Sequence, residues 1–246
     1  ASREAWHFAA QGGRAGAYDI VVAAGVEVMT RTPMGASIVQ GLGFPFPQAQ
    51  LDRYAETGLP GQGIGADMIA DEFGITREDM DAFGAESQRR AFVATSEGRF
   101  ENEIIPIEVD LGDGPVMHTT DEGIREGSTA EKLATLKPAF AEDGKITAGN
   151  SSQICDGASA VLVMSAEKAA ELGLTARARF HSFAVACTDP VTMLKGPIPA
   201  TTQIPETSAL STDDIEVIEL HDAFACGVVG FGRAPRELPK RSIKPA

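Results

Sequence analysis

The sequence predicts an α/β fold, and two observations carry that prediction. Residues 2–16 repeat small or apolar side chains at helical spacing, and residues 19–25 form an apolar, β-branched run without alternation. A helix followed by a strand covered on both faces indicates a layered α/β arrangement. A glycine-rich turn at residues 146–160, followed by a second apolar run, indicates another buried strand.

Composition narrows the class of protein. The chain has 246 residues, 43% of them hydrophobic, and a formal charge of −14, so it can bury a substantial core. Nucleic acid and anionic membranes need a basic face, and the acidic balance argues against both as partners. No apolar run is long enough to span a membrane and no signal peptide is visible, so we expect a soluble, cytoplasmic protein.

The first helix places Ala5, Phe8, Ala9 and Gly12 on one stripe, with Gly16 as its stop. Periodicity is then lost over residues 32–65, where prolines and glycines surround Phe44 and Phe46. An irregular segment of this length is usually functional or an insertion.

Two helices are expected next, at residues 66–73, with Gly74 as the C′ residue, and at 76–97. Thr76 and Asp79 have the spacing of a short capping box, and Gly98 provides a stop. Residues 99–109 alternate apolar and charged side chains, which predicts a half-exposed strand.

The chain from residue 110 to 143 is polar and turn-rich. A strand is expected at 160–164, followed by a helix with Ser165 as N-cap that ends at Gly173.

A second α/β unit is expected to begin at 177–186, and Gly-Pro-Ile-Pro at 196–199 predicts a rigid, extended connection. Residues 215–219 form a short predicted strand, after which His221 opens a helix. The tail, 230–246, is basic and proline-rich, and its composition favours disorder.

The turn at 146–160, ITAGNSSQICDGASA, has two interpretations: a tight turn before a buried strand, or a backbone wall that lines a ligand pocket. Its Cys155 has Asp156 beside it, which disfavours the thiolate, so we predict a buried, inert thiol. Cys187, near Asp189, receives the same interpretation. Three irregularly spaced cysteines fit neither a disulfide framework nor a zinc site, and we expect no structural metal.

His221 is expected where a strand ends and a helix begins, a common position for ligand contacts in α/β folds. A neutral imidazole there could orient a water or a carbonyl oxygen, although a structural histidine is equally consistent with the spacing. Cys226 shares a helix face with Asp222 and not with His221, so we do not expect it to be a nucleophile.

Taken together, five blocks of the sequence resemble the thiolases, acyltransferases that cleave 3-ketoacyl-CoA or run the reverse Claisen condensation. The resemblance covers about residues 1 to 229 and is closest to degradative thiolases of the fatty-acid β-oxidation or steroid side-chain type. The blocks are YDIVVAAGVEVMTRTPMG, GITREDMDAFGAESQRRA, ITAGNSSQICDGASAVLVMS, DPVTMLKGPIPAT and IEVIELHDAFA.

This resemblance implies a five-layer α/β/α/β/α fold with an inserted loop domain, and it implies that the fold is incomplete here, in a chain truncated at both ends. Residues 1–30 and 155–173 would belong to the N-terminal half, and 31–154 to the loop domain that binds coenzyme A. Residues 175–229 would belong to the C-terminal half, with 230–246 as a tail. Family members are homodimers or homotetramers, so self-association is expected.

The resemblance also implies site residues. Arg125 corresponds to a loop-domain arginine near the nucleotide end of coenzyme A, and Lys132 lies two turns further if that stretch is helical. Ser152 corresponds to the serine that hydrogen-bonds the pantetheine arm, with Ala148 and Gly149 allowing close backbone approach. Acyl-CoA and coenzyme A are therefore the expected ligands, as substrates and not as a covalently bound cofactor.

Of the four catalytic positions of a thiolase, the resemblance places one here: His221, which would help hold a water in an oxyanion hole. The family's nucleophilic cysteine would precede Ala1, no GHP histidine is present, and Pro205 interrupts a helix that is continuous in the family. The expectation is a thiolase fragment that is inactive alone. The alternative is a non-catalytic thiolase-like protein that binds acyl-CoA or supports a partner subunit.

Overall fold

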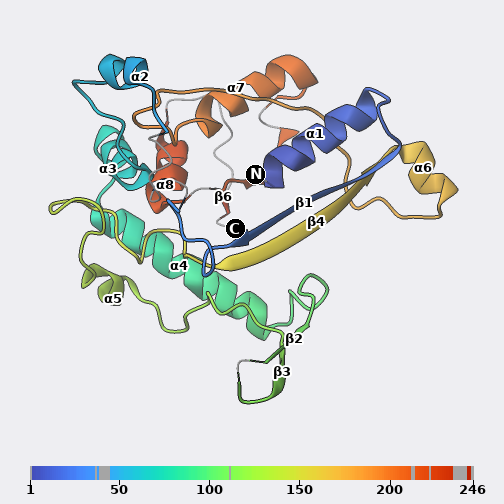
Figure 1. Cartoon of the computed structure of the whole chain (residues 1–246), viewed down its shortest axis with the longest axis horizontal. Coiled ribbons are helices and arrows are strands. Elements are labelled where there is room, and N and C mark those ends of the chain that lie inside the picture. Colours follow the sequence, from blue (N-terminus) through green and yellow to red (C-terminus); the bar gives the residue numbers. More distant parts are fainter. Residues whose placement is uncertain are drawn as a thin grey trace. The chain divides into compact units, whose positions relative to one another are not determined.

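The computed structural model describes residues 2–36, 38, 45–110, 112–211, 214–221, 223–234 and 243–244 (Figure 1). The chain forms two compact units, and each is described by itself. The first comprises residues 1–56, 154–186 and 200–211, and the second comprises residues 57–153, 187–199 and 212–246.

The first unit is built on a pair of long strands. Helix α1 (Ser2–Arg14) leads into β1 (Ile20–Val28), which pairs antiparallel with β4 (Asp156–Met164) in a register from Ile20 opposite Met164 to Val28 opposite Asp156. Helix α1 contacts both strands. The predicted helix and the positions of the two predicted strands are thus confirmed, with both strands longer than expected. The prediction that both strands are buried is wrong, because most of their residues are exposed. Gly16 has the positive φ of a helix stop.

Short helices complete this unit. They are α2 (Gln48–Arg53), inside the segment expected to be irregular, and α6 (Ala166–Glu171). The Ser165 side chain accepts a hydrogen bond from the Lys168 amide, and Gly173 has a φ of +67°. Both predicted ends of α6 are confirmed. Phe44 lies outside the described residues.

The second unit is mainly helical. Its longer helices are α3 (Gln62–Glu72), α4 (Arg77–Ser96) and α8 (Ala225–Arg233), and α5 (Ala130–Ala134) is a single turn beside α4. Strands β2 (Ile107–Asp110) and β3 (Pro115–His118) form a hairpin. Strands β5 (Ile218–Glu219) and β6 (Ile243–Lys244) form a short parallel pair.

Helix α4 begins with the capping box that the sequence predicts. Thr76 Oγ1 accepts from the Asp79 amide at 3.1 Å, and the Asp79 carboxylate accepts from the Thr76 amide at 3.1 Å. These hydrogen bonds, with the guanidinium of Arg233 at 2.7 Å, hold the pKa of Asp79 below its usual value. The start of α4 is therefore fixed by both local and long-range contacts.

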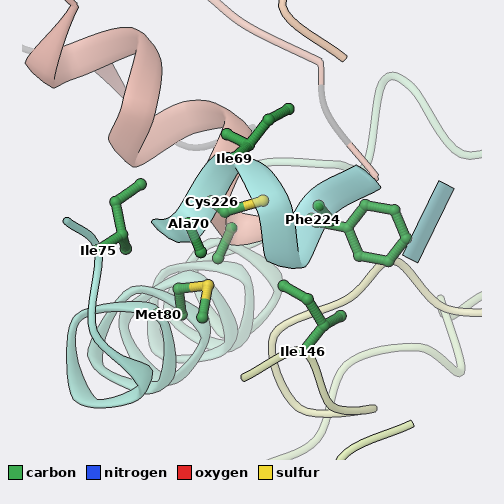
Figure 2. Packing of buried hydrophobic residues seen from close by; sticks show 9 residues of the cluster. Ile69, Ala70, Ile75, Met80, Ile146, Phe224 and Cys226 are labelled. Carbon is green, nitrogen blue, oxygen red and sulfur yellow. The ribbon is translucent and has the colours of Figure 1, made fainter. Parts of the chain in front are cut away.

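The core of the second unit lies between α3, α4 and α8. Figure 2 shows buried side chains from these helices, with Ile146 and Phe224, converging on one cluster. The buried members are Ala66, Ile69, Ala70, Ile75, Met80, Ile146, Phe224, Ala225 and Cys226. Ile146 and Phe224 flank the segments that carry Ser152 and His221. These two segments are therefore attached to the core.

Four predictions about the second half of the chain are corrected. Residues 177–186 contain neither helix nor strand, so no second α/β unit begins there. The predicted extended connection at 196–199 is the start of helix α7 (Pro197–Ser208), which also runs through position 205. Proline is favoured in the first helical turn because its missing N–H has no helical partner there.

The third correction concerns His221, which does not open a helix: α8 begins four residues later, with Phe224 as N-cap. The fourth concerns the tail, because α8 extends to Arg233 and β6 lies at its far end. Residues 235–242 lie outside the described part of the chain. No helix among the described residues is both long and apolar enough to cross a lipid bilayer.

Candidate functional site

A groove of about 460 Å³ runs between α4 and the segment 125–130 in the second unit. Its walls carry two arginines, Arg89 and Arg125, and two glutamates, Glu86 and Glu126. The remaining lining residues are Ala82, Ala85, Gln88, Phe92, Gly127, Ser128, Thr129 and Ala130. A lining that combines apolar side chains with arginines suits a ligand that has a flat apolar part and anionic groups.

The backbone at Arg125 is fixed by side chains from elsewhere in the unit. Gln88 of α4 accepts a hydrogen bond from the Arg125 amide at 2.7 Å, and the side-chain amide of Gln153 donates to the carbonyl oxygen of Gly123. The Ser128 hydroxyl donates to the Arg125 carbonyl oxygen at 3.1 Å. The Arg125 guanidinium is exposed and is absent from the ion pairs that the described residues form.

The second groove arginine is already paired. The Glu86 carboxylate accepts from Arg89 Nε at 2.7 Å and Nη2 at 2.8 Å, and from Arg90 Nε at 2.6 Å. These charge-assisted hydrogen bonds lower the pKa of Glu86 to about 2. Glu86 is therefore an anion at neutral pH and partly offsets two positive charges, which leaves Arg125 as the stronger attraction for an anion.

Lys132 does not lie two helical turns beyond Arg125. Helix α5 begins only at Ala130, with Thr129 as its N-cap, so the chain between the two residues is a turn. The ammonium group of Lys132 donates to the Gly127 carbonyl oxygen at 2.7 Å. The lysine thus braces the same turn that lines the groove.

The segment 146–153 is held by a buried polar network. Asn150, 4% exposed, accepts from the Thr147 amide at 2.8 Å and donates to Asp81 Oδ1 at 3.0 Å. Asp81, 1% exposed, also accepts from Arg77 Nε at 2.7 Å. The conformation of the segment is therefore fixed from α4.

Gly149 approaches protein atoms closely. A Cβ added there would lie 2.7 Å from Leu133 Cδ2 and 2.8 Å from Leu136 Cδ1, and a Cβ at Gly84 of α4 would collide with the Gly149 carbonyl oxygen. The close neighbours that the structure shows are therefore α4 and the side chains of Leu133 and Leu136, and the approach of Ala148 and Gly149 to a pantetheine arm stays a prediction. Ala148 is exposed beside it.

Ser152 is connected to the segment that carries His221. The Ser152 amide donates to the Ala223 carbonyl oxygen at 2.7 Å, and the Ala225 amide donates to that of Asn150 at 2.9 Å. This antiparallel pairing brings Ser152 beside the chain two residues after His221. His221 itself is exposed.

The three thiols differ in exposure. Cys226 is fully buried in the core cluster, whereas Cys155 and Cys187 are exposed. The prediction of buried thiols at 155 and 187 is therefore wrong, and Asp222, the expected neighbour of Cys226, lies outside the described residues. Within the described chain, no group of three His, Cys, Asp or Glu side chains is arranged to hold a metal ion.

Helix α4 was not among the predicted parts of the site. Gln88, Arg89 and Asp81 all face the segments that carry the predicted ligand contacts. The sequence signal that could have indicated this role is a row of polar residues at helical spacing, on a helix face that packs against another segment of the chain.

Two family models match the chain. The model described as "Thiolase, N-terminal domain" matches residues 1–167, and "Thiolase, C-terminal domain" matches residues 174–234. A solved structure of an acetyl-CoA acetyltransferase from Syntrophomonas wolfei superposes with a TM-score of 0.79 at 32% identity, covering 94% of this chain and 60% of that one.

Sequence relatives carry similar names. An acetyl-CoA acetyltransferase of Pseudomonas aeruginosa is 42% identical over 94% of this chain and 60% of its own length. A 3-ketoacyl-CoA thiolase of Marinobacter nauticus is 45% identical (89% and 55%). A steroid 3-ketoacyl-CoA thiolase of Mycobacterium tuberculosis is 40% identical (94% and 56%). The chain thus spans between 55% and 60% of the length of these relatives.

Proposed function

The chain belongs to the thiolase family and has its α/β fold, and on that premise we propose that it binds coenzyme A and its acyl esters. The observation that supports this most is the groove between α4 and residues 125–130, with the exposed Arg125 at its rim. Coenzyme A ends in an adenine ring with phosphates, which matches an apolar groove that carries a cation. Because the chain has a net charge of −14, an anionic ligand should bind where a cationic side chain such as Arg125 is exposed.

The proposal extends to the pantetheine arm. The Ser152 hydroxyl and the backbone at Ala148 and Gly149 would contact that arm, and Lys132 would support the turn below the nucleotide. His221 would hydrogen-bond the water of an oxyanion hole. Support comes from the pairing of residues 150–152 with 223–225, which places these two segments side by side in one unit.

The reaction proposed for the thiolase assembly is acyl exchange with coenzyme A: thiolytic cleavage of a 3-ketoacyl-CoA of the fatty-acid or steroid side-chain type, or the reverse condensation. It proceeds through a thioester on a cysteine. None of the cysteines in this chain is assigned that role, since Cys226 is buried in the core, and Cys155 and Cys187 each have an aspartate close by in sequence, which disfavours the thiolate. We further propose a cytoplasmic, self-associating protein.

Replacing Arg125 by alanine is expected to weaken coenzyme A binding by about tenfold, because a charge-assisted contact to phosphate contributes about 1.5–3 kcal/mol. Titration calorimetry of the 246-residue chain with coenzyme A measures this. Arg99→Ala is the matched control, since Arg99 is exposed beyond the end of α4 and pairs with Glu97. Equal affinities for the two variants would remove Arg125 from the site.

A thiolysis assay tests whether the chain carries its own nucleophile. The isolated chain, mixed with a 3-ketoacyl-CoA and coenzyme A, is expected to bind but to produce no acyl-CoA above background, measured by loss of the ketoacyl absorbance. Binding without turnover also fits the alternative, a non-catalytic acyl-CoA-binding protein or partner subunit. Turnover at ordinary thiolase rates would show that one of the chain's own thiols is the nucleophile.

A further inference from the structure

One face of α4 carries a stripe of four residues, Arg77, Asp81, Gly84 and Gln88. Their spacing of i, i+4, i+7 and i+11 keeps them within about 60° of arc on the helix. We propose that this stripe is the positioning element of the coenzyme A site, with Gln88 aligning the Arg125 segment and Asp81 aligning the Ser152 segment. The proposal rests on the proposed function above.

Gln88 acts at the nucleotide end of the groove. Its Oε1 accepts from the Arg125 amide at 2.7 Å, and its Nε2 lies 3.5 Å from the Gly123 carbonyl oxygen. Because this hydrogen bond is to the backbone amide, it fixes the position of the Arg125 backbone and leaves the guanidinium available to a ligand. Loss of this bond would leave the charge in place but let the segment move.

Asp81 acts on the other segment. Its Oδ1 accepts from Asn150 Nδ2, and Asn150 in turn fixes the Thr147 amide and, through its own carbonyl oxygen, the Ala225 amide. Asp81 Oδ2 is held by Arg77, whose Nη2 donates to the carbonyl oxygens of Leu133 and Leu136 at 2.7 and 3.0 Å. One carboxylate therefore connects α5, the Ser152 segment and the chain after His221.

Gly84 sits between these two contacts. Its missing side chain lets the Gly149 carbonyl oxygen approach the helix backbone. The polar members on either side have their partners on binding segments and not in solvent. A stripe of this kind differs from an ordinary solvated helix face, because Asp81, Gly84 and Gln88 each contact a segment that carries a proposed ligand contact, and Arg77 holds Asp81.

The test compares two ligands on the full chain: coenzyme A and 3′,5′-ADP, which is its nucleotide part. Gln88→Met keeps the side-chain length and removes the acceptor, so it should weaken binding of both ligands about fivefold, the effect of losing one positioning hydrogen bond. Asp81→Asn should weaken coenzyme A by a similar factor and leave 3′,5′-ADP within twofold, because the Ser152 segment contacts only the pantetheine arm.

A charge swap tests the assignment of Asp81 directly. In the double variant Asp81→Asn with Asn150→Asp, the amide at 81 can donate to the carboxylate at 150, while the other carboxylate oxygen still accepts from the Thr147 amide. Asn150 Nδ2 also donates to the Lys145 carbonyl oxygen at 3.2 Å, a bond that a carboxylate at position 150 cannot make. Coenzyme A affinity should therefore recover in part from its value in Asp81→Asn alone. A loss of stability alone would weaken the binding of both ligands, so it would not produce a loss and recovery of affinity confined to coenzyme A.

Two controls complete the experiment. Thr76→Ala removes the N-cap of α4 and lowers the thermal midpoint without touching the stripe, and Gln62→Met makes the glutamine change at the exposed first residue of α3. Both should leave the two dissociation constants unchanged at a temperature where the variants are folded. If the starting chain binds both ligands, and Gln88→Met and Asp81→Asn bind them with unaltered affinities, the inference is overturned while the proposed function stands. No binding of coenzyme A by the starting chain overturns the proposed function and the inference with it.

Discussion

Replacing Asp81 by alanine is expected to lower the free energy of unfolding by about 3 kcal/mol. The Asp81 side chain is 2% exposed and accepts from both Arg77 and Asn150. Its removal takes the counter-charge and the Nε acceptor from the partly buried Arg77 guanidinium, and one of the two acceptors from Asn150 Nδ2. An unmatched charge in such a place costs more than the lost hydrogen bonds themselves. Urea unfolding followed by circular dichroism measures the loss.

The double variant Asp81→Ala with Arg77→Met gives the matched comparison. Removing both charges should recover part of the lost stability, since an apolar pair leaves no unmatched charge. Asp113→Ala, at the exposed turn between β2 and β3, controls for the loss of one carboxylate and should change stability by less than about 0.5 kcal/mol. If the double variant were less stable than Asp81→Ala alone, the hydrogen bonds of Arg77 to Leu133 and Leu136 would outweigh the cost of its unmatched charge.

Replacing Gly84 by alanine is expected to destabilise the chain by about 1–2 kcal/mol. Alanine is favoured over glycine in a helix by about 1 kcal/mol, but here the new Cβ would collide with the Gly149 carbonyl oxygen. That oxygen belongs to backbone fixed by Thr147 and Asn150, so relief requires the segment to shift. Overpacking of this kind costs about 1–3 kcal/mol and outweighs the helical gain.

The same substitution at Gly13 gives the contrast. Gly13 lies in α1, and an added Cβ there would meet only the Tyr18 carbonyl oxygen at 4.0 Å. Gly13→Ala should therefore leave stability unchanged or raise it by up to about 1 kcal/mol. A stabilising effect at both positions would show that Gly149 does not approach α4 as closely as the structure indicates.

Features fixed by short stretches of sequence were predictable. The capping box at Thr76 and Asp79, the N-cap at Ser165 and the glycine stops at 16, 74, 98 and 173 each depend on residues within one or two turns. Here local hydrogen bonds and the conformational freedom of glycine decide the structure. The α/β arrangement of α1, β1 and β4 followed from helical and apolar periodicity in the same way.

Features that depend on distant partners were not predictable. Small residues at 148 and 149 predicted a close approach to a ligand, but the neighbour that the structure shows for Gly149, Gly84 of α4, lies more than sixty residues away in sequence. The Gly-Pro-Ile-Pro run predicted an extended chain, but proline is also favoured in the first turn of a helix, which is where the structure has it, in α7. Arg125 and Ser152 were predicted as site residues from the family resemblance. Their shared connection to helix α4 is visible only in the structure.

Binding of coenzyme A by the 246-residue chain tests the central claim most directly. Calorimetric titration should show one saturable site, with 3′,5′-ADP competing for it and affinity falling as salt rises because phosphate meets a cation near the surface. The sample must also show cooperative thermal unfolding. A folded chain that takes up no coenzyme A, or takes it up without competition from 3′,5′-ADP, would contradict the assignment of the groove at Arg125.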